Sequence, residues 1–352
     1  MNNFLKMSKA IWMLLIGFIL CVFNAAGQSM HFSQYYNAPL LLSPANTALL
    51  PDNDFRVGLN YRNQWAAVPV PYNTFSGYAD CKIYNKNESG DGSQNKWLGV
   101  GLAFFSDKAG DGNLALTEVQ GNLAYHLQMG AYSMISFGLS GAYVQRSVNY
   151  DNITFDAQWD GEKFNPVYAN GEKLGIIKTN YYTIAPGLNL AIFPNENLYM
   201  KFGASVANVN QPKETFYKNG TNTLKYRPEG NIDVLFKTGP VLIINPSVYY
   251  ATQNGASELV VGTLFRTVLG ENQNHQTTQL ILGIFDRVGD AAIGVAGLQV
   301  GSVQFMANYD FTMSRLSPYN AAYGALEFSL IYQGKYYKNN GIKRTYSCPQ
   351  FF

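Results

Sequence analysis

The chain has 352 residues, and 25 Lys and Arg against 23 Asp and Glu give a formal net charge of only +2. A nucleic-acid-binding protein needs a basic excess on one face, so the charge argues against that class. Charged residues make up 14% of the chain, which is below the roughly 25% of ordinary soluble domains. The mean hydropathy of −0.11 excludes a bundle of membrane helices, whereas many Tyr, Phe and Gly favour a transmembrane β-barrel, in which only alternate strand residues face lipid.

The first 27 residues predict a signal peptide. Lys6 and Lys9 precede an apolar run that extends from Ile11 to Phe23, and small residues follow at positions 25–27. A run of this length suits the core of a signal peptide better than a membrane helix. We therefore expect cleavage before Gln28, although a buried helix of a cytosolic protein is an alternative. Removing residues 1–27 removes two Lys and no acid, which leaves 23 basic and 23 acidic residues.

Residues 28–53 form an irregular, apolar segment. Pro39, Pro44 and Pro51 interrupt it, so regular secondary structure is not expected. Its apolar side chains need a buried environment. The sequence predicts either a plug inside the barrel lumen or a lid over the periplasmic mouth, and it does not decide between them.

From residue 54 to residue 333 the sequence alternates between apolar and polar residues with a period of two. Val57, Leu59 and Tyr61, for example, alternate with Asn60 and Arg62. This pattern predicts half-buried strands. We expect fourteen of them, near residues 54–65, 73–83, 97–105, 113–128, 132–146, 180–192, 197–207, 224–237, 240–251, 257–268, 278–287, 290–299, 302–312 and 322–333.

The expected fold is therefore all-β, a transmembrane antiparallel β-barrel of about 14 strands in the outer membrane. An even number of strands suits a barrel whose two termini lie in the periplasm. A soluble sandwich or propeller would also alternate, but the low charge and the aromatic residues near strand ends favour the barrel. The strand near 290–299 is the weakest, because Gly and Ala blur its alternation.

The lengths of the connections mostly agree with a barrel whose two termini lie in the periplasm. The longest, residues 147–179, falls on the outside, where barrels carry their long loops, although 84–96 and 269–277 would be long periplasmic turns. The outside loop is rich in aromatic side chains, which interfaces favour because they bury large areas at low entropy cost. They are candidates for binding a partner or, equally, for packing on the barrel mouth as a lid: Tyr150, Phe155, Trp159, Phe164 and Tyr168.

Charged side chains on the polar strand faces are expected to point into the lumen. The two signs are balanced, which suggests a lumen with ion pairs, filled by a plug or partner, rather than a single-sign ion pore. They are Arg56, Arg62, Lys82, Lys201, Arg266 and Arg287, with Asp80, Glu118, Asp233, Glu258, Asp310 and Glu327.

No motif indicates catalysis, a cofactor or a metal. The sequence lacks a Gly-x-Ser-x-Gly motif, and the spacing of Cys81 and Cys348 to the three His matches no zinc motif. His126 is expected to be a hydrogen-bonded lumen residue, and Cys81 a small residue that points to lipid. An outer-membrane hydrolase is therefore a weak alternative. Residues 334–352 form a basic tail, which either binds a periplasmic partner or is simply solvated.

Several motifs together resemble the PorP/SprF family of type IX secretion system proteins, over the whole mature chain. They are His31-Phe32-Ser33-Gln34-Tyr35-Tyr36, Ser43-Pro44-Ala45-Asn46, Tyr61-Arg62-Asn63-Gln64-Trp65, Tyr309-Asp310-Phe311, Gly324-Ala325-Leu326-Glu327 and Cys348-Pro349.

The resemblance implies an outer-membrane barrel that is not an enzyme. It implies an accessory that assists the export or surface anchoring of a specific secreted protein, such as a gliding adhesin. The implied partners are a secreted surface protein with a type IX C-terminal domain, components of the secretion system and membrane lipid. An outer-membrane channel for a small solute or apolar substrate is the alternative function.

Overall fold

The computed structural model describes residues 32–50, 53–65, 71–83, 96–110, 114–149, 153–165, 167–169, 176–216, 220–271, 277–314 and 323–336. The proposed signal peptide, 1–27, and all of the basic tail beyond residue 336 lie outside these ranges. None of the described helices is long and apolar enough to cross a membrane.

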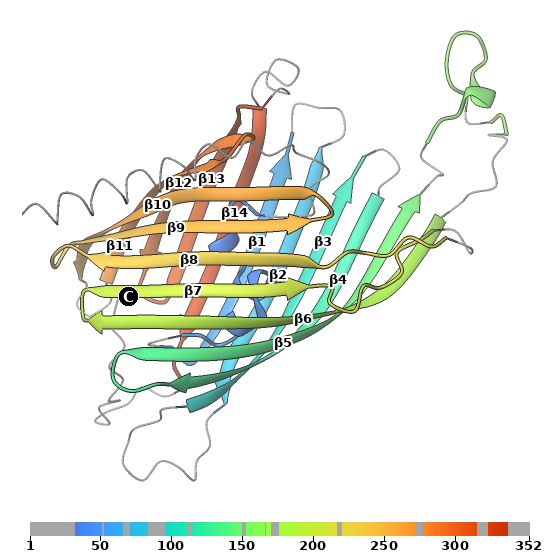
Figure 1. The fold of residues 1–352 in the computed structure, drawn as a ribbon. Coiled ribbons are helices and arrows are strands. Elements are labelled where there is room, and N and C mark those ends of the chain that lie inside the picture. The colour runs from blue at the N-terminus through green and yellow to red at the C-terminus, as the bar shows by residue number, and fades with distance from the viewer. Residues whose placement is uncertain are drawn as a thin grey trace, which may run out of the picture.

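Fourteen antiparallel strands form one closed barrel in which β1 pairs with β14 (Figure 1). The strands are β1 (Phe55–Gln64), β2 (Tyr72–Ile83), β3 (Lys96–Ala109), β4 (Leu114–Gln128), β5 (Ser133–Asn149), β6 (Ile176–Asn195), β7 (Leu198–Ala207), β8 (Arg227–Lys237), β9 (Leu242–Gln253), β10 (Ala256–Glu271), β11 (Thr277–Arg287), β12 (Ala291–Val300), β13 (Val303–Thr312) and β14 (Tyr323–Gly334). The predicted number and order of strands are confirmed.

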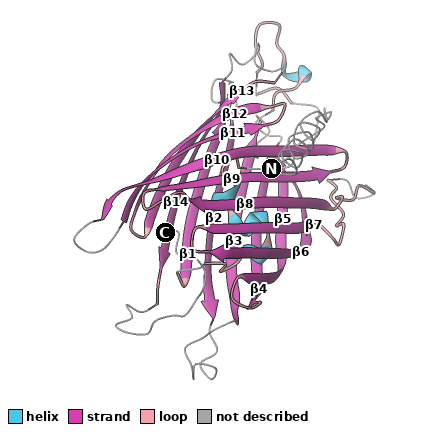
Figure 2. Ribbon diagram, turned by 60° about the vertical axis from the view of Figure 1, so that its left-hand side comes forward, coloured by secondary structure: helices cyan, strands magenta, loops and turns pink. Residues whose placement is uncertain are grey.

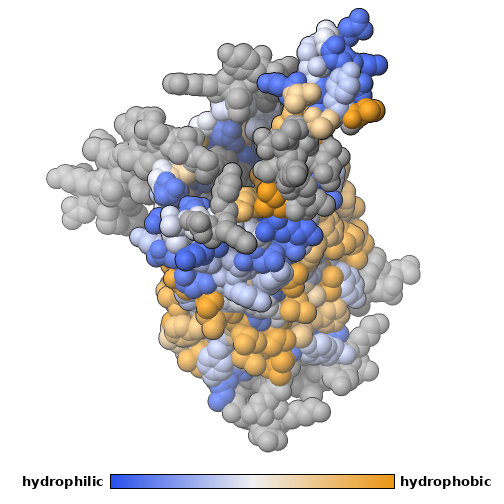
Figure 3. Space-filling model, turned by 90° about the vertical axis from the view of Figure 1, so that its right-hand side faces the viewer, coloured by the Kyte–Doolittle hydropathy of each residue, from blue (hydrophilic) through white to orange (hydrophobic). Residues whose placement is uncertain are grey.

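The alternation places apolar side chains on the outer wall. Leu123 on β4 and Phe305 on β13 are 54% and 47% exposed, whereas Gln120 and Asn308, on the inward face of the same two strands, are buried. Orange, hydrophobic side chains cover much of the barrel wall in Figure 3, and blue ones gather toward the end with the long loops. An outer-membrane barrel requires this apolar outer band, because lipid cannot satisfy polar groups.

Tight turns join several strand pairs. The two-residue turn between β9 and β10 has Asn254 at φ +50° and Gly255 at φ +85°. Positive φ at both central residues is the requirement of a type I′ hairpin, which Asn-Gly meets at little steric cost. Strand ends and turns therefore follow local sequence chemistry.

The weak alternation of β12 has a structural cause. Its inward residues Ile293 and Val295 are buried in an apolar cluster with Ile281 and Phe285 of β11. The inward face thus carries an apolar patch on this side of the barrel. The apolar cluster exists because part of the N-terminal segment packs against it.

Candidate functional site

Residues 32–50 lie inside the barrel and are called the plug below. They form three short helices, η1 (Tyr35–Asn37), α2 (Pro39–Leu42) and η2 (Pro44–Asn46). Figure 2 shows these helices enclosed by the strands. Most of the plug side chains are buried, and Leu40, Ala45 and Thr47 are fully so. The apolar composition of the segment is explained by this position.

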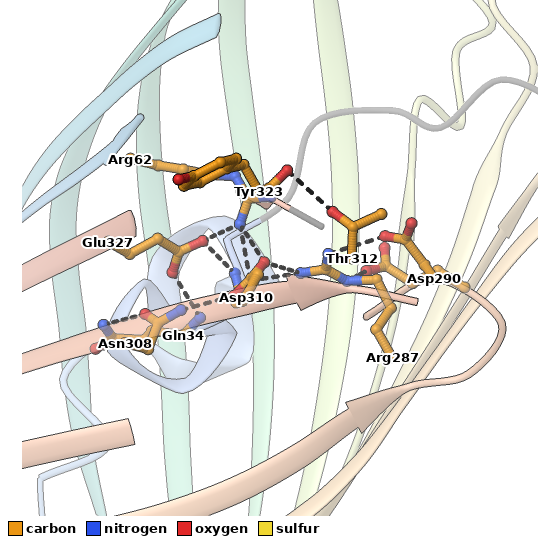
Figure 4. Close-up of polar contacts among 11 residues, drawn as sticks. Gln34, Arg62, Arg287, Asp290, Asn308, Asp310, Thr312, Tyr323 and Glu327 are labelled. Carbon is orange, nitrogen blue, oxygen red and sulfur yellow. Dashed lines mark hydrogen bonds and ion pairs between the residues drawn. The ribbon is translucent and has the colours of Figure 1, made fainter. Parts of the chain in front are cut away.

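Charged lumen residues hold the first part of the plug. The backbone N–H groups of Ser33 and Gln34 donate to the two carboxylate oxygens of Glu327 on β14, at 2.7 and 3.0 Å. The Ser33 hydroxyl donates to Asp310 on β13 at 2.6 Å. Arg62 on β1 binds both carboxylates (Figure 4). The first part of the plug is thereby tied to β14 through its backbone, and to β13 and β1 through the Ser33 hydroxyl, which also accepts from Arg62.

A second arginine extends this cluster. Arg287 on β11 lies 3.3 Å from Asp310, 3.2 Å from Glu258 on β10 and 3.1 Å from Asp290. Almost no part of the Arg287 side chain is exposed. Charges buried to this extent are tolerated only with several partners each, and the cluster provides them.

Backbone hydrogen bonds also hold the last part of the plug. The N–H of Ala48 donates to Asp80 on β2 at 2.6 Å, and the same carboxylate accepts two bonds from Arg56 on β1. The Trp97 indole donates to the Ala48 carbonyl at 3.0 Å. His126 has a partner for each ring nitrogen, the Thr47 carbonyl and the Ser136 hydroxyl, both at 2.8 Å. His126 is therefore a hydrogen-bonded lumen residue, as expected.

Between these ends the plug lies directly on glycine backbone. A Cβ atom at Gly138 on β5 would lie 2.2 Å from the Ala45 nitrogen, and one at Gly187 on β6 would lie 2.5 Å from the Ser43 hydroxyl oxygen. The two glycines are paired across β5 and β6. Gly99 on β3 makes a similar approach to the Thr47 carbonyl. These three residues are called the glycine seat.

Most of the expected lumen charges have partners. Besides the pairs above, Lys201 lies 3.1 Å from Asp233, and Lys82 lies over the Trp97 ring, 4.7 Å from its centroid. Arg266 donates to Gln304 at 3.3 Å. Glu118 is the exception, because it makes no hydrogen bond or ion pair with any described residue. Sequence reasoning missed the pair of Arg227 with Glu229, as well as that of Arg146 with Glu214.

Cavities lie on opposite sides of the plug among the described residues. One, of about 240 Å³, lies between the plug and the loop end and is lined by residues such as Phe32, Glu118 and Glu214. The other, of about 180 Å³, lies toward the turn end and is lined by residues such as Tyr199, Lys201 and Asp233. The plug thus separates two spaces within one lumen.

The outside loop is only partly described, and Tyr150 lies outside the described residues. Phe155 is half-buried beside the short helix η5 (Asp156–Gln158). Trp159 and Phe164 pair as an antiparallel bridge, with ring centroids 5.0 Å apart, and both remain about half exposed, like Tyr168. This part of the loop stands clear of the barrel mouth in Figure 1.

The tip of the loop is closed by one carboxylate. The backbone N–H groups of Lys163 and Glu162 donate to Asp160 at 2.8 and 3.0 Å. Both bonds stabilise the charged form and so lower the pKa of Asp160, and the bond from Lys163 has the larger effect.

Cys81 is half-buried on the outer face of β2, between the inward residues Asp80 and Lys82. In the described part of the chain, no group of three or more His, Cys, Asp or Glu residues could hold a metal ion.

Comparison with known proteins identifies the family. The model of the type IX secretion system membrane protein PorP/SprF matches residues 24–332. The chain belongs to the PorP/SprF family. It is therefore an outer-membrane β-barrel of the type IX secretion system, in a family that is not known for enzymes.

Solved structures share only the fold. The toluene transporter TbuX of Ralstonia pickettii has a TM-score of 0.52 and 8% identity, over 86% of this chain and 94% of that one. The toluene transporter TodX of P. putida has a TM-score of 0.47 and 8% identity, over 86% and 95%. No curated protein sequence matches the chain.

Proposed function

We propose that this protein is an accessory of type IX secretion that holds or helps export one specific secreted protein at the cell surface. The observation that carries the proposal is that the chain fills its own lumen. Both ends of the plug are hydrogen-bonded through their backbone to buried carboxylates, Glu327 and Asp80. A lumen filled in this way leaves little room for a solute to pass. This favours a function in which the barrel binds a partner at its outer surface.

The outside loop supplies a surface suited to a partner. Trp159, Phe164 and Tyr168 are about half exposed on a loop that stands away from the barrel. Aromatic side chains of this kind are the residues that carry most of the binding energy in interfaces. Their exposure argues for the partner interpretation over the self-packed lid. The partner would be a secreted protein with a type IX C-terminal domain.

A triple substitution tests the loop. Replacing Trp159, Phe164 and Tyr168 by Ala should abolish retention of one surface protein, while the barrel still inserts and migrates as a heat-modifiable band. The readout is the proteome of shaved cell surfaces, compared with the culture medium. A matched control replaces the exposed polar residues Asp156, Glu162 and Lys163 by Ala in the same loop. Unchanged retention of every surface protein in the aromatic variant would sink the proposal.

A channel is the second candidate function. The two cavities on either side of the plug favour it, because they leave space for a small solute above and below. The described lumen between them is occupied by the plug. In planar bilayers we expect the whole protein to show no steady conductance, whereas a variant without residues 32–50 should conduct. Steady conductance of the whole protein would favour the channel instead.

A further inference from the structure

The cavity between the plug and the loop end is lined partly by apolar and partly by charged side chains. One side is an apolar cluster of Phe105, Leu116, Val144 and Tyr181, to which Phe32 of the plug contributes. Other lining residues are charged, with three carboxylates and two arginines. This excess of one negative charge favours a cationic ligand.

Four of the five charged groups already have partners. Arg146 lies 2.5 Å from Glu214, and Arg227 lies 3.3 Å from Glu229. Glu118 has no hydrogen bond or ion pair with a described residue. Its cross-strand neighbours are Phe105 on β3 and Val144 on β5, both buried and apolar.

A carboxylate that has no partner among the described residues and lies between two apolar neighbours is costly to keep charged. Even partial burial of a charge without a partner disfavours the folded state. Glu118 is half-buried and lines the cavity. The position therefore suits a cationic ligand that enters the cavity and pairs with the Glu118 carboxylate.

We propose that this cavity binds a primary alkylammonium group. The ammonium donates to the Glu118 carboxylate, and the alkyl stem packs on Phe105, Leu116 and Val144. A flexible stem that covers apolar surface while its charged head finds a polar partner is the normal behaviour of lysine. The volume of about 240 Å³ lies below the roughly 300–1,000 Å³ of sites for drug-sized ligands. It therefore suits one side chain or one small amine.

Two sources could supply this chemistry. One is a lysine side chain of a polypeptide that reaches the loop end, and this source rests on the proposed function. The other is a free alkylamine, which does not. The binding site itself is independent of the choice, because both present the same ammonium and stem to Glu118.

Calorimetry with the full mature protein in nanodiscs tests the site, with empty nanodiscs as background. The probes are hexylammonium and hexanol, then N-acetyl-lysine methylamide and N-acetyl-norleucine methylamide. A charge-assisted hydrogen bond predicts that each ammonium binds at least about tenfold more tightly than its neutral partner. If the lysine derivative binds more tightly than hexylammonium, the source is a polypeptide. The reverse order indicates a free amine.

Two variants localise the effect. Glu118→Gln should remove the preference for the ammonium probes. Asp233→Asn is the control, since Asp233 is a lumen carboxylate that lines the other cavity and pairs with Lys201. It should leave the preference unchanged.

Equal binding of hexylammonium and hexanol to the wild-type protein would overturn the proposal, whatever the variants do. An unchanged preference in Glu118→Gln would overturn it as well. The loop test of the proposed function is read on cells and has a separate outcome, so failure of one does not imply failure of the other.

Discussion

The two faces of the barrel wall place different demands on the residues that form them. On the outer face, Leu123 and Phe305 meet lipid, which is fluid and accepts any apolar side chain. On the inner face, Gly138 and Glu327 each meet particular backbone atoms of the plug. The outer face therefore specifies a class of residue, whereas the inner face specifies individual residues.

The largest expected difference between the two faces is in the free energy of unfolding lost when Glu327, which binds the plug backbone, is replaced. Glu327→Ala removes the acceptor of two plug N–H groups and a partner of buried Arg62. Breaking a buried pair from one side should lower the free energy of unfolding by about 3–5 kcal/mol. Denaturant unfolding in lipid vesicles measures it. Leu326→Ala, on the outer face of the same strand, should cost much less, and equal losses would contradict the comparison.

A charge on the lipid face should have the next largest effect. Leu123→Arg should lower the free energy of unfolding by about 2–4 kcal/mol, because arginine is poorly accommodated at the membrane midplane. Thr183→Arg, which points into the cavity beside the plug, should cost less. The same unfolding titration compares the two. Gln120 would be a poor control, because it donates to the plug carbonyl of Leu40 at 3.1 Å.

The smallest expected effect is a single methyl group in the glycine seat. Gly138→Ala forces a Cβ against plug backbone, and overpacking of this kind should cost about 1–3 kcal/mol. It should also make the plug more accessible to protease in detergent. Gly141→Ala on the same strand is the control, since a Cβ there meets nothing within 4 Å. If the two variants unfold alike, the glycine seat does not position the plug.

The outer face made the fold predictable from sequence. Lipid demands an apolar residue at every second position, so alternation alone gave fourteen strands in the right order. Its signal was weakest for β12, which the structure nevertheless places at Ala291–Val300, and there the inward residues Ile293 and Val295 pack in the apolar cluster beside the plug. The inward direction of the charged residues followed from the same alternation.

The inner face was harder to predict. Composition left residues 28–53 as a plug or a lid, because both need apolar side chains. Nothing in the sequence distinguished Gly138 and Gly187 from other strand glycines, since their role depends on where the plug backbone lies. Glu118 was one of twelve lumen charges, and its having no partner among the described residues depends on distances that the sequence does not contain. The loop aromatics remain a prediction.

The position of Ser33 and Gln34 has a consequence for assembly. Their acceptor Glu327 lies almost 300 positions later in the chain, at separations of 294 and 293. These bonds must wait for the last strand to be synthesised and inserted, and contacts between such distant positions form late in folding. Arg62 on β1 joins the same carboxylate, so the seam between the first and last strands and the plug are completed together. A barrel that had not yet joined at this seam would leave its plug without its anchor, and we expect docking of the plug and closure of the seam to be one cooperative step.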